Sequence, residues 1–259
     1  MRSPENVLKS LSEKAKNKDY RYERLYRNLY NPEFYLLAYQ NIATSQGSMT
    51  AGADGLTLDG MSMERIEKLI AKLRDHSYQP NPARRVYIAK KNSNKKRPLG
   101  IPSTDDKLLQ EVVRMILEAI YEPTFSDNSH GFRPKRSCHT ALKEIVTLFT
   151  GAKWIIEGDI KACFDSFDHH ITIQLLRKRI KDEAFISLMW KFLRAGYMEQ
   201  WTYHETYSGS PQGSGVSPIL ANIYLNELDE FMGKMKKSFD KGDTRNRKVL
   251  KDHDKVRWA

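Results

Sequence analysis

Apolar and aromatic residues recur at helical spacing near the start of the chain and predict helices there. The pattern restarts at Asn31-Pro32, where Asn is a preferred N-cap and Pro suits the first helical position. Tyr22 and Tyr26 share the helical spacing, which favours packing between helices. The helical start covers residues 1–45, and later amphipathic helices are predicted at 62–76, at 103–122, and from Ser137 with Ala141, Leu142, Ile145 and Phe149 facing inward.

Three segments have the pattern of strands. The sequence RRVYIAKKNSNKKRPLGIPS (84–103) predicts a strand, a basic turn and a second strand. A short apolar run, WII, begins a predicted buried strand over residues 154–160, and YMEQWTYHETYSG (197–209) predicts an aromatic hairpin. The remaining helical patterns lie at 167–180, at 182–195 and from Ser217 to about Met232. Because helices and antiparallel hairpins are mixed without strict alternation, we expect an α+β fold.

Composition adds a strong positive charge to this picture. The chain of 259 residues has a net charge of +11 and a pI near 9.5, which favours a polyanionic partner such as nucleic acid. Such a partner leaves a second role open for the N-terminal tyrosines, stacking on bases or contacting phosphates. Cys138 and Cys163 lack the spacing of a zinc site or a disulfide framework, so we expect reduced thiols. No apolar run is long enough to span a membrane and no signal-peptide core is visible, so we expect a cytoplasmic protein without membrane contact.

Polar residues gather after the predicted strand at 154–160. Asp159 stands at its end, where a carboxylate is suited to a metal site or, equally, to a cap or a salt bridge. Asp165 precedes the next helix and can cap it. His169 and His170 are adjacent and cannot face one metal ion from one side of a helix, so we expect them in an exposed first turn.

Two loops are suited to phosphate. The Gly213-Ser214-Gly215 loop lies just before the helix start at Ser217, where backbone amides can approach an anion closely. A plain turn into a core helix is the alternative for this loop. The turn KKNSNKKRP crowds several cations whose mutual repulsion a phosphate would relieve, and a solvated basic loop is the alternative there.

Four segments occur in the order of the fingers and palm blocks of group II intron-encoded reverse transcriptases, also called maturases. They are KKRPLGIPSTDDKLLQEVV, HGFRPKRSCHTAL, EGDIKACFDSFDHH and SPQGSGVSPILANIYLNELD, and they span roughly residues 85–232. The N-terminal helical region and GADGLT are similar to that family's N-terminal extension. The resemblance implies the fingers and a partial palm of a right-hand polymerase. The domains it implies are a helical N-terminal extension at 1–60, fingers at 61–152, and a partial palm at 153–259 with an inserted fingers-side helical segment near 182–200 and a basic C-terminal connector.

The resemblance also implies roles for individual residues. Asp159 matches the first metal-binding aspartate of the palm, with the Ile160 carbonyl as a further ligand to Mg²⁺, and two such ions can activate a primer hydroxyl and stabilise pyrophosphate. Phe164 matches a steric gate against a ribose 2′-hydroxyl, and Gln212 matches a residue lining the nucleotide pocket. Nucleotide binding is expected from Lys90, Lys91, Arg97, Phe164 and Gln212, and RNA binding from Lys95, Lys96, Arg133, Lys135 and Arg136.

The implied function is that of an RNA-directed DNA polymerase that binds group II intron RNA and supports splicing and retrohoming. Its implied partners are the intron RNA, an RNA template with a DNA primer, and deoxynucleoside triphosphates. The Tyr-x-Asp-Asp motif that carries the family's remaining catalytic carboxylates does not occur in the sequence. We therefore expect the chain itself to be inactive, and to form a homodimer through an unpaired sheet edge. The alternative is a non-catalytic RNA-binding splicing cofactor, and retron, diversity-generating or defence-associated reverse transcriptases are alternatives within the same class.

Overall fold

The computed structural model describes residues 2–45, 47–89, 94, 96–209 and 213–241. The chain forms two compact units. The first comprises Met1–Thr124 and Ala162–Ile223, and the second comprises Phe125–Lys161 and Tyr224–Ala259. Helices and strands are mixed, which confirms the predicted α+β class. None of the described helices has both the length and the apolar character that a membrane span requires.

Helix starts in the first unit follow the capping signals in the sequence. Asn31, Ser62 and Ser103 each accept a hydrogen bond from a backbone amide in the first turn, as predicted for these starts. The helices of this unit are α1 (Pro4–Ala15), α2 (Pro32–Ala43), α3 (Met63–Arg74), α4 (Thr104–Tyr121), α6 (Cys163–Ser166), α7 (His169–Arg177) and α8 (Glu183–Leu193), with short 3₁₀ helices η1 (Tyr26–Tyr30), η2 (Leu58–Gly60) and η3 (Glu122–Thr124), and α9 (Ser217–Lys241) begins here and continues into the second unit.

Helix α4 forms the centre of the core of the first unit. The sequence predicted one amphipathic face along it, but the helix is buried around most of its circumference. Leu108, Leu109, Val112, Val113 and Ile116 each have 0% of their surface exposed. Both α1 and α2 pack against α4, which explains why it needs more than one apolar face. Burial of each such side chain contributes roughly 1.5–3 kcal/mol.

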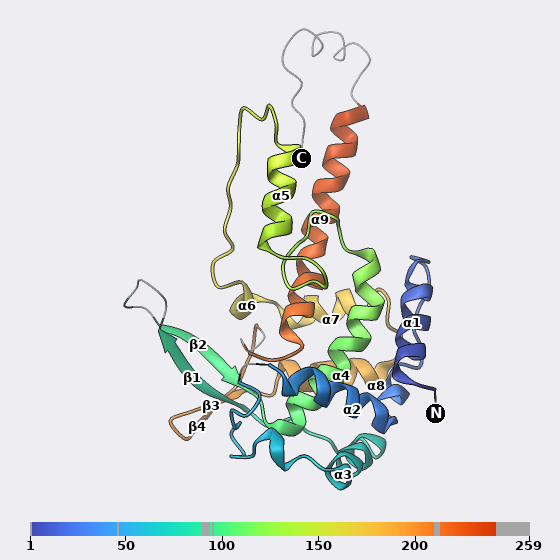
Figure 1. Ribbon diagram of the computed structural model, residues 1–259, viewed down its shortest axis with the longest axis vertical. Coiled ribbons are helices and arrows are strands. Elements are labelled where there is room, and N and C mark those ends of the chain that lie inside the picture. The colour runs from blue at the N-terminus through green and yellow to red at the C-terminus, as the bar shows by residue number, and fades with distance from the viewer. Residues whose placement is uncertain (1, 46, 90–93, 95, 210–212, 242–259) are drawn as a thin grey trace. The chain divides into compact units, whose positions relative to one another are not determined.

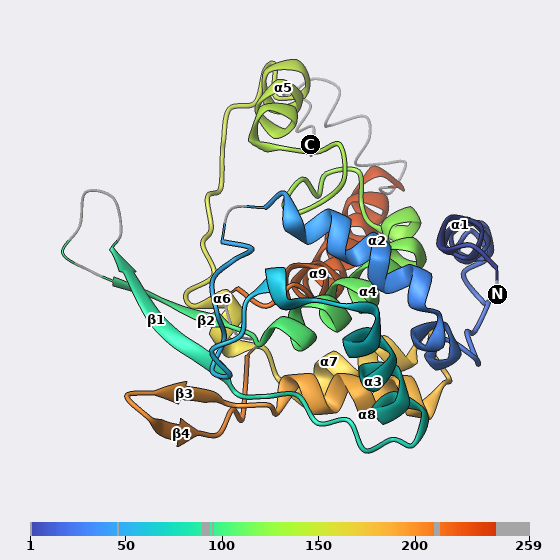
Figure 2. The same ribbon diagram turned by 60° about the horizontal axis from the view of Figure 1, so that its bottom comes forward.

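Four described strands form one mixed sheet, which extends from the side of the helices of the first unit (Figures 1 and 2). The predicted basic hairpin is β1 (Ala83–Ala89) paired antiparallel with β2 (Lys96–Ile101). The predicted aromatic hairpin is β3 (Tyr197–Glu199) paired with β4 (Thr202–His204). Strand β1 also pairs in parallel with β3, so the order is β2–β1–β3–β4. Both predicted hairpins are therefore confirmed, and they join into a single sheet.

The segment after α1 departs from the helical pattern predicted for it, because tertiary contacts hold it in another conformation. Tyr22 forms an isolated parallel bridge with Ile180, and its backbone amide donates to the Arg179 carbonyl at 2.8 Å. The Arg179 guanidinium is buried and donates to the carbonyls of Ala15 at 3.0 Å and Asn17 at 3.2 Å. These carbonyls lie at the C-terminus of α1, where a cation is favoured by the helix dipole. Arg179 thus ties the end of α1 to the segment after α7.

The N-terminal tyrosines pack inside the first unit. Tyr22 and Tyr26 have 3% and 6% of their surface exposed. Their hydroxyls donate to the carbonyls of Leu11 at 2.7 Å and Leu73 at 3.1 Å. Burial raises the pKa of Tyr26 to about 12. The predicted packing role of these two side chains is confirmed, and stacking on bases is excluded for them in this conformation.

A buried carboxylate joins the connection before β1 to the start of α4. Asp106 lies in the first turn of α4 and is 1% exposed. It accepts hydrogen bonds from the Tyr78 hydroxyl, from the Asn81 backbone amide at 2.9 Å and from the Ser103 hydroxyl at 2.6 Å. Burial raises the pKa of Asp106, and its hydrogen bonds oppose that rise. The network joins the connection before β1 to the start of α4 around one side chain.

The start of α7 differs from the prediction in two details. Asp168, rather than Asp165, is the N-cap, since its side chain accepts from the Ile171 amide at 2.9 Å while Asp165 lies within α6. His170 is exposed as predicted, but His169 is 3% exposed. Nε2 of His169 donates to the Gly209 carbonyl at 2.7 Å, and burial lowers the pKa of this imidazole. His169 is thus buried in the first turn of α7 because it bonds the carbonyl of Gly209, which is distant in the sequence.

The second unit contains α5 (Cys138–Leu148) and the C-terminal part of α9. Ser137 caps α5 in a capping box with Thr140, which confirms the predicted helix start. The predicted inward face of α5 is wrong, because Leu142 and Ile145 are 57% and 44% exposed. The described residues of this unit place no covering layer on that face.

The buried strand predicted over residues 154–160 is not formed. The segment is coil, and Trp154, Ile155 and Ile156 are 90%, 75% and 91% exposed. A strand must pair its backbone amides and carbonyls with a neighbour. Among the described residues, no strand or bridge pairs with this segment. Asp159 therefore lies in exposed coil and not at the end of a strand.

We predict that the Asp106→Asn variant changes the pH dependence of stability. The folded pKa of Asp106 lies above its ordinary value of 3.8, so between these values the folded chain keeps a proton that the unfolded chain releases. The stability that this group contributes is therefore fully present below the unfolded pKa and is lost as the pH rises through the folded pKa. Asn does not titrate, so the wild type should lose unfolding free energy relative to the variant over that range and then level off.

Urea unfolding of both proteins at increasing pH, from about pH 4 upward, measures this difference. The exposed variant Asp19→Asn is the control and should follow the wild type. A difference between wild type and Asp106→Asn that stays constant with pH would contradict the prediction.

Candidate functional site

The β1–β2 hairpin presents two different faces to the rest of the first unit. Strand alternation puts Arg97 and Leu99 on one face, and Pro98 and Gly100 on the other. Leu99 contacts the loop that begins at Gly213. Pro98 and Gly100 line a cleft of about 420 Å³. One face of β2 therefore packs against a loop, and the other face lines an open cleft.

The loop after Gly213 packs directly onto β2 and α4. Gly213 has a φ of +103°, and a Cβ there would lie 2.5 Å from the Gly100 carbonyl oxygen. Oε1 of Gln110, on α4, accepts from the Ser214 hydroxyl at 2.9 Å and from the Gly215 amide at 3.1 Å. The groups that the sequence offered to a phosphate are thus bonded to a buried glutamine. For Ser214 and Gly215 the structure favours the alternative, a fixed turn into a helix.

The predicted sugar gate, Phe164, lies in α6 and is held by a close approach of Gly209. Gly209 has a φ of +78°, and a Cβ there would lie 2.6 Å from the Phe164 carbonyl oxygen and 2.7 Å from the Asp165 Cα. The Gly209 amide donates to the Phe167 carbonyl at 2.7 Å, and the rings of Phe164 and Phe167 meet edge-on at 6.1 Å. Gly209 thereby fixes the backbone of Phe164 against the segment that precedes residues 210–212.

The predicted cations of the hairpin are described only in part. Arg97 is exposed on β2 opposite Ile88, and Lys96 is exposed opposite Ala89. Both therefore present their charges to solvent near the end of the hairpin at which β1 connects to β2. The predicted residues Lys90, Lys91, Lys95 and Gln212 lie outside the described residues.

The three predicted RNA-binding residues of the HGFRPKRS block belong to the second unit and differ from one another. Arg133 is 8% exposed, and its Nη1 donates to two backbone carbonyls of its own loop at 2.6 and 2.8 Å. Lys135 is exposed. Arg136 forms an ion pair with Asp127 at 2.9 Å. Arg133 therefore holds its loop together, and an RNA contact would require its release.

Asp159 and Ile160 lie together in the exposed coil of the second unit. Carboxylate and carbonyl oxygens are the donors that hard divalent cations prefer, so Asp159 is chemically suitable as a ligand. A two-metal centre needs several converging carboxylates. Within the described ranges, no three Asp, Glu, His or Cys side chains gather in a way that could hold a metal ion. The described residues alone therefore do not fit the implied two-metal centre.

The cleft has a stacked floor that sequence reasoning missed. The Arg85 guanidinium carbon lies 3.4 Å from the centroid of the Tyr197 ring, which stacks on His204 at 4.9 Å and an interplanar angle of 15°. Glu199 accepts from the Tyr87 hydroxyl at 2.6 Å and lies 3.9 Å from Arg85. Alternation along the aromatic hairpin could have placed Tyr197 and Glu199 on one face. The parallel pairing with β1 that brings Arg85 to them has no local signal.

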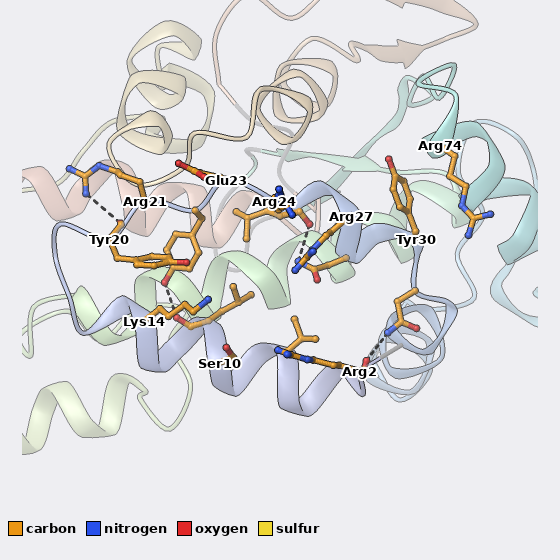
Figure 3. A pocket seen from close by; sticks show the side chains of 16 residues that line it. Arg2, Ser10, Lys14, Tyr20, Arg21, Glu23, Arg24, Arg27, Tyr30 and Arg74 are labelled. Atoms are coloured by element: carbon orange, nitrogen blue, oxygen red, sulfur yellow. Dashed lines mark hydrogen bonds between the residues drawn. The ribbon is translucent and has the colours of Figure 1, made fainter.

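A larger pocket, of about 770 Å³, lies between α1 and the segment at 20–31, and Figure 3 shows cationic side chains around it. Among its described lining residues, six are cations and one, Glu23, is acidic. None of the six forms an ion pair with a carboxylate in the described part of the chain. Lys14 lies 5.2 Å from the centroid of the Tyr20 ring. The residues of this six-cation pocket are Arg2, Lys14, Arg21, Arg24, Arg27 and Arg74.

Known sequences are similar to this chain over most of its length. The profile of the reverse transcriptase (RNA-dependent DNA polymerase) family matches residues 88–240. The group II intron-encoded protein LtrA of Lactococcus lactis subsp. cremoris is 55% identical over 236 residues, which cover 91% of this chain and 39% of that protein. A 91 kDa protein in the cob intron of Schizosaccharomyces pombe is 50% identical over 241 residues, which cover 91% of this chain and 30% of that protein. The chain thus spans well under half the length of these two relatives.

Solved structures share the fold. A chain of a partial Cas6-RT-Cas1–Cas2 complex superposes with a TM-score of 0.54 at 22% identity, covering 81% of this chain and 35% of that chain. The family profile matches more than half of the chain and contains most of the segments in which the motifs were found. The chain therefore belongs to the reverse transcriptase family, with group II intron-encoded proteins among its relatives, as its motifs predicted.

Proposed function

We propose that this chain forms the fingers and part of the palm of a group II intron reverse transcriptase that binds intron RNA and supports splicing and retrohoming. The observation that carries the proposal is the 55% identity to LtrA over 91% of the chain. The domains proposed are the N-terminal extension at 1–60, the fingers at 61–152 and the partial palm at 153–259. These are functional divisions, and they differ from the two compact units.

Reverse transcriptases act on nucleic acid and use divalent metal ions. For this chain we propose an RNA template with a DNA primer, deoxynucleoside triphosphates and Mg²⁺. When bound, Mg²⁺ would supply charge stabilisation for nucleotidyl transfer. Asp159 and the Ile160 carbonyl are its proposed ligands, and residues outside the described ranges or beyond this chain must complete the set. The proposed triphosphate contacts are Arg97, Lys90 and Lys91, with Phe164 and Gln212 beside the sugar and base.

We propose that intron RNA binds the six-cation pocket and, separately, cations of the β1–β2 segment and of the second unit. Six positive charges around one hollow repel one another, and a phosphate backbone relieves that repulsion and releases counterions. The proposed RNA contacts beyond the pocket are Lys95, Lys96, Lys135 and Arg136.

A homodimer and a cytoplasmic location are also proposed. The exposed apolar side chains of Trp154, Ile155 and Ile156 support self-association, since soluble monomers rarely present such a run to water. Cys138 and Cys163 are not joined in a disulfide, which supports a reducing compartment.

The polymerase proposal is best tested in a chimera, because the chain spans 39% of LtrA. In the chimera this chain replaces the matching segment of LtrA. We expect RNA-templated primer extension with Mg²⁺, and its loss with Asp159→Ala while RNA binding is retained. Glu157→Gln, in the same coil, is the matched control and should extend the primer. A chimera that binds intron RNA but extends nothing would favour the non-catalytic splicing cofactor.

We predict that Arg24→Ala combined with Arg27→Ala flattens the salt dependence of intron RNA binding. Both side chains are exposed lining residues of the six-cation pocket, so their loss should spare the fold. Each lost phosphate contact lowers the slope of log K against log salt by roughly 0.7–0.9. Filter binding over a salt series measures the slope. Lys9→Ala combined with Lys18→Ala removes the same charge outside the pocket, and an equal flattening there would count against the pocket.

We predict that Phe164→Val in the chimera raises incorporation of ribonucleotides relative to deoxyribonucleotides. A smaller side chain would leave room for the 2′-hydroxyl, and the ratio should rise by about tenfold or more. Single-nucleotide primer extension with each sugar measures the ratio. Phe167→Val is the control, since Phe167 is buried beside Phe164 but has no predicted sugar contact. Unchanged sugar selectivity in an active Phe164→Val chimera would disprove the gate.

A further inference from the structure

The β3–β4 hairpin carries aromatic side chains that the proposed polymerase and intron-binding roles leave unused. Trp201 at its tip is 95% exposed, and Tyr203 is 48% exposed. Gln200 and Trp201 form the two-residue turn, and their φ values of +48° and +65° are uncommon for residues other than glycine. The turn holds the Trp201 indole in solvent, where its large apolar ring contributes almost no buried area to the stability of the fold. Such exposure at a strained position points to an external partner.

A hollow of about 470 Å³ lies beside this hairpin and combines rings with cations. Tyr203 and Trp190 line it, together with Lys191 and Arg194. The Arg194 guanidinium carbon lies 4.4 Å from the centroid of the Trp190 ring, and Lys191 Nζ donates to the Tyr78 carbonyl at 2.6 Å. Among the described residues, no carboxylate lines the hollow and neither cation has an acidic partner. The hollow is therefore basic and aromatic, and its volume is in the range of ligand sites.

The acidic residues of the same hairpin do not cancel this charge. Glu199 is bonded to the Tyr87 hydroxyl and lies near Arg85 on the face that lines the other cleft. Glu205 accepts a hydrogen bond from Tyr207 and also belongs to that cleft. The two faces of the hairpin thus differ. The face with Tyr203 meets rings and cations with no carboxylate among the described lining residues, whereas the other face combines the Tyr197 ring and Arg85 with Glu199.

We propose that this hollow, with Trp201 at the tip of the adjoining hairpin, binds a single-stranded segment of nucleic acid by stacking on its bases. Every base offers a flat ring to an aromatic side chain, whatever the sequence, while cations contact the backbone. An apolar protein surface would leave the cations of the hollow without acidic partners. A nucleic-acid strand matches the hollow better, because its bases can stack on the rings and its phosphates can pair with the cations. The inference rests on the proposed nucleic-acid function, but it concerns single strands and a surface separate from the six-cation pocket.

The test is binding of a short oligouridylate to the full chain, measured by fluorescence anisotropy, with an abasic strand of the same phosphate number as a second ligand. Trp201→Ala should weaken binding of the oligouridylate by about tenfold and leave binding of the abasic strand unchanged, because only bases stack. Trp201→Phe keeps a ring and should restore most of the affinity. Arg194→Gln should weaken both ligands and lower the salt slope.

Tyr207→Ala is the matched control, since Tyr207 is 82% exposed but belongs to the other cleft. It should bind the oligouridylate like the wild type. Equal affinity of the wild type and Trp201→Ala for the oligouridylate would overturn the proposal, as would an equal loss for the abasic strand. Either result, with structured intron RNA still bound in a salt-dependent manner, would leave the proposed function standing and assign the hairpin to a protein partner. Loss of structured RNA binding in the wild type would instead remove the proposed function.

Discussion

One buried carboxylate sets the geometry on which the sheet and the core of the first unit depend. Asp106 bonds the Tyr78 hydroxyl, the Asn81 amide and the Ser103 hydroxyl, so the connection before β1 and the end of β2 meet at the first turn of α4. Because α4 is buried around most of its surface, its position is fixed by many neighbours. The hairpin that leaves this junction inherits that fixed position. A chemical site on the hairpin is therefore carried by a rigid base, as precise positioning requires.

The cationic side chains of the chain have two different roles. Arg179 and Arg133 are buried, and their guanidinium groups donate hydrogen bonds to backbone carbonyls and so stabilise the fold. The cations of the six-cation pocket, of which only Arg21 is half-buried, and the exposed Arg194 have no acidic partner among the described residues. A count of Lys and Arg in the sequence does not separate these groups. The structure does, since a guanidinium surrounded by carbonyls has few donors left for a phosphate.

Elements whose signal is local could be predicted from the sequence. The helix start at Ser103, the capping box at Ser137 and both hairpins follow from neighbouring residues, and they are confirmed. Features that depend on a partner far away in the sequence could not be predicted. The run WII reads as a strand, but a strand exists only with a neighbour, and none of the described strands pairs with it. Arg85 meets Tyr197 through a parallel pairing between strands far apart in sequence. The motifs predicted the family. The stacked floor of the cleft and the basic pockets could be identified only in the folded chain, because their residues come from distant parts of the sequence.

The contact of Arg179 with Ala15 spans 164 positions of the chain. During synthesis, α1 leaves the ribosome long before the arginine that secures its last turn. At about 5–20 residues per second, the helix waits roughly 10–30 s for this partner. A helix of 12 residues is marginal by itself in water. The N-terminal segment is therefore exposed to proteases and chaperones for that interval, and a chaperone that recognises amphipathic helices has its best opportunity there.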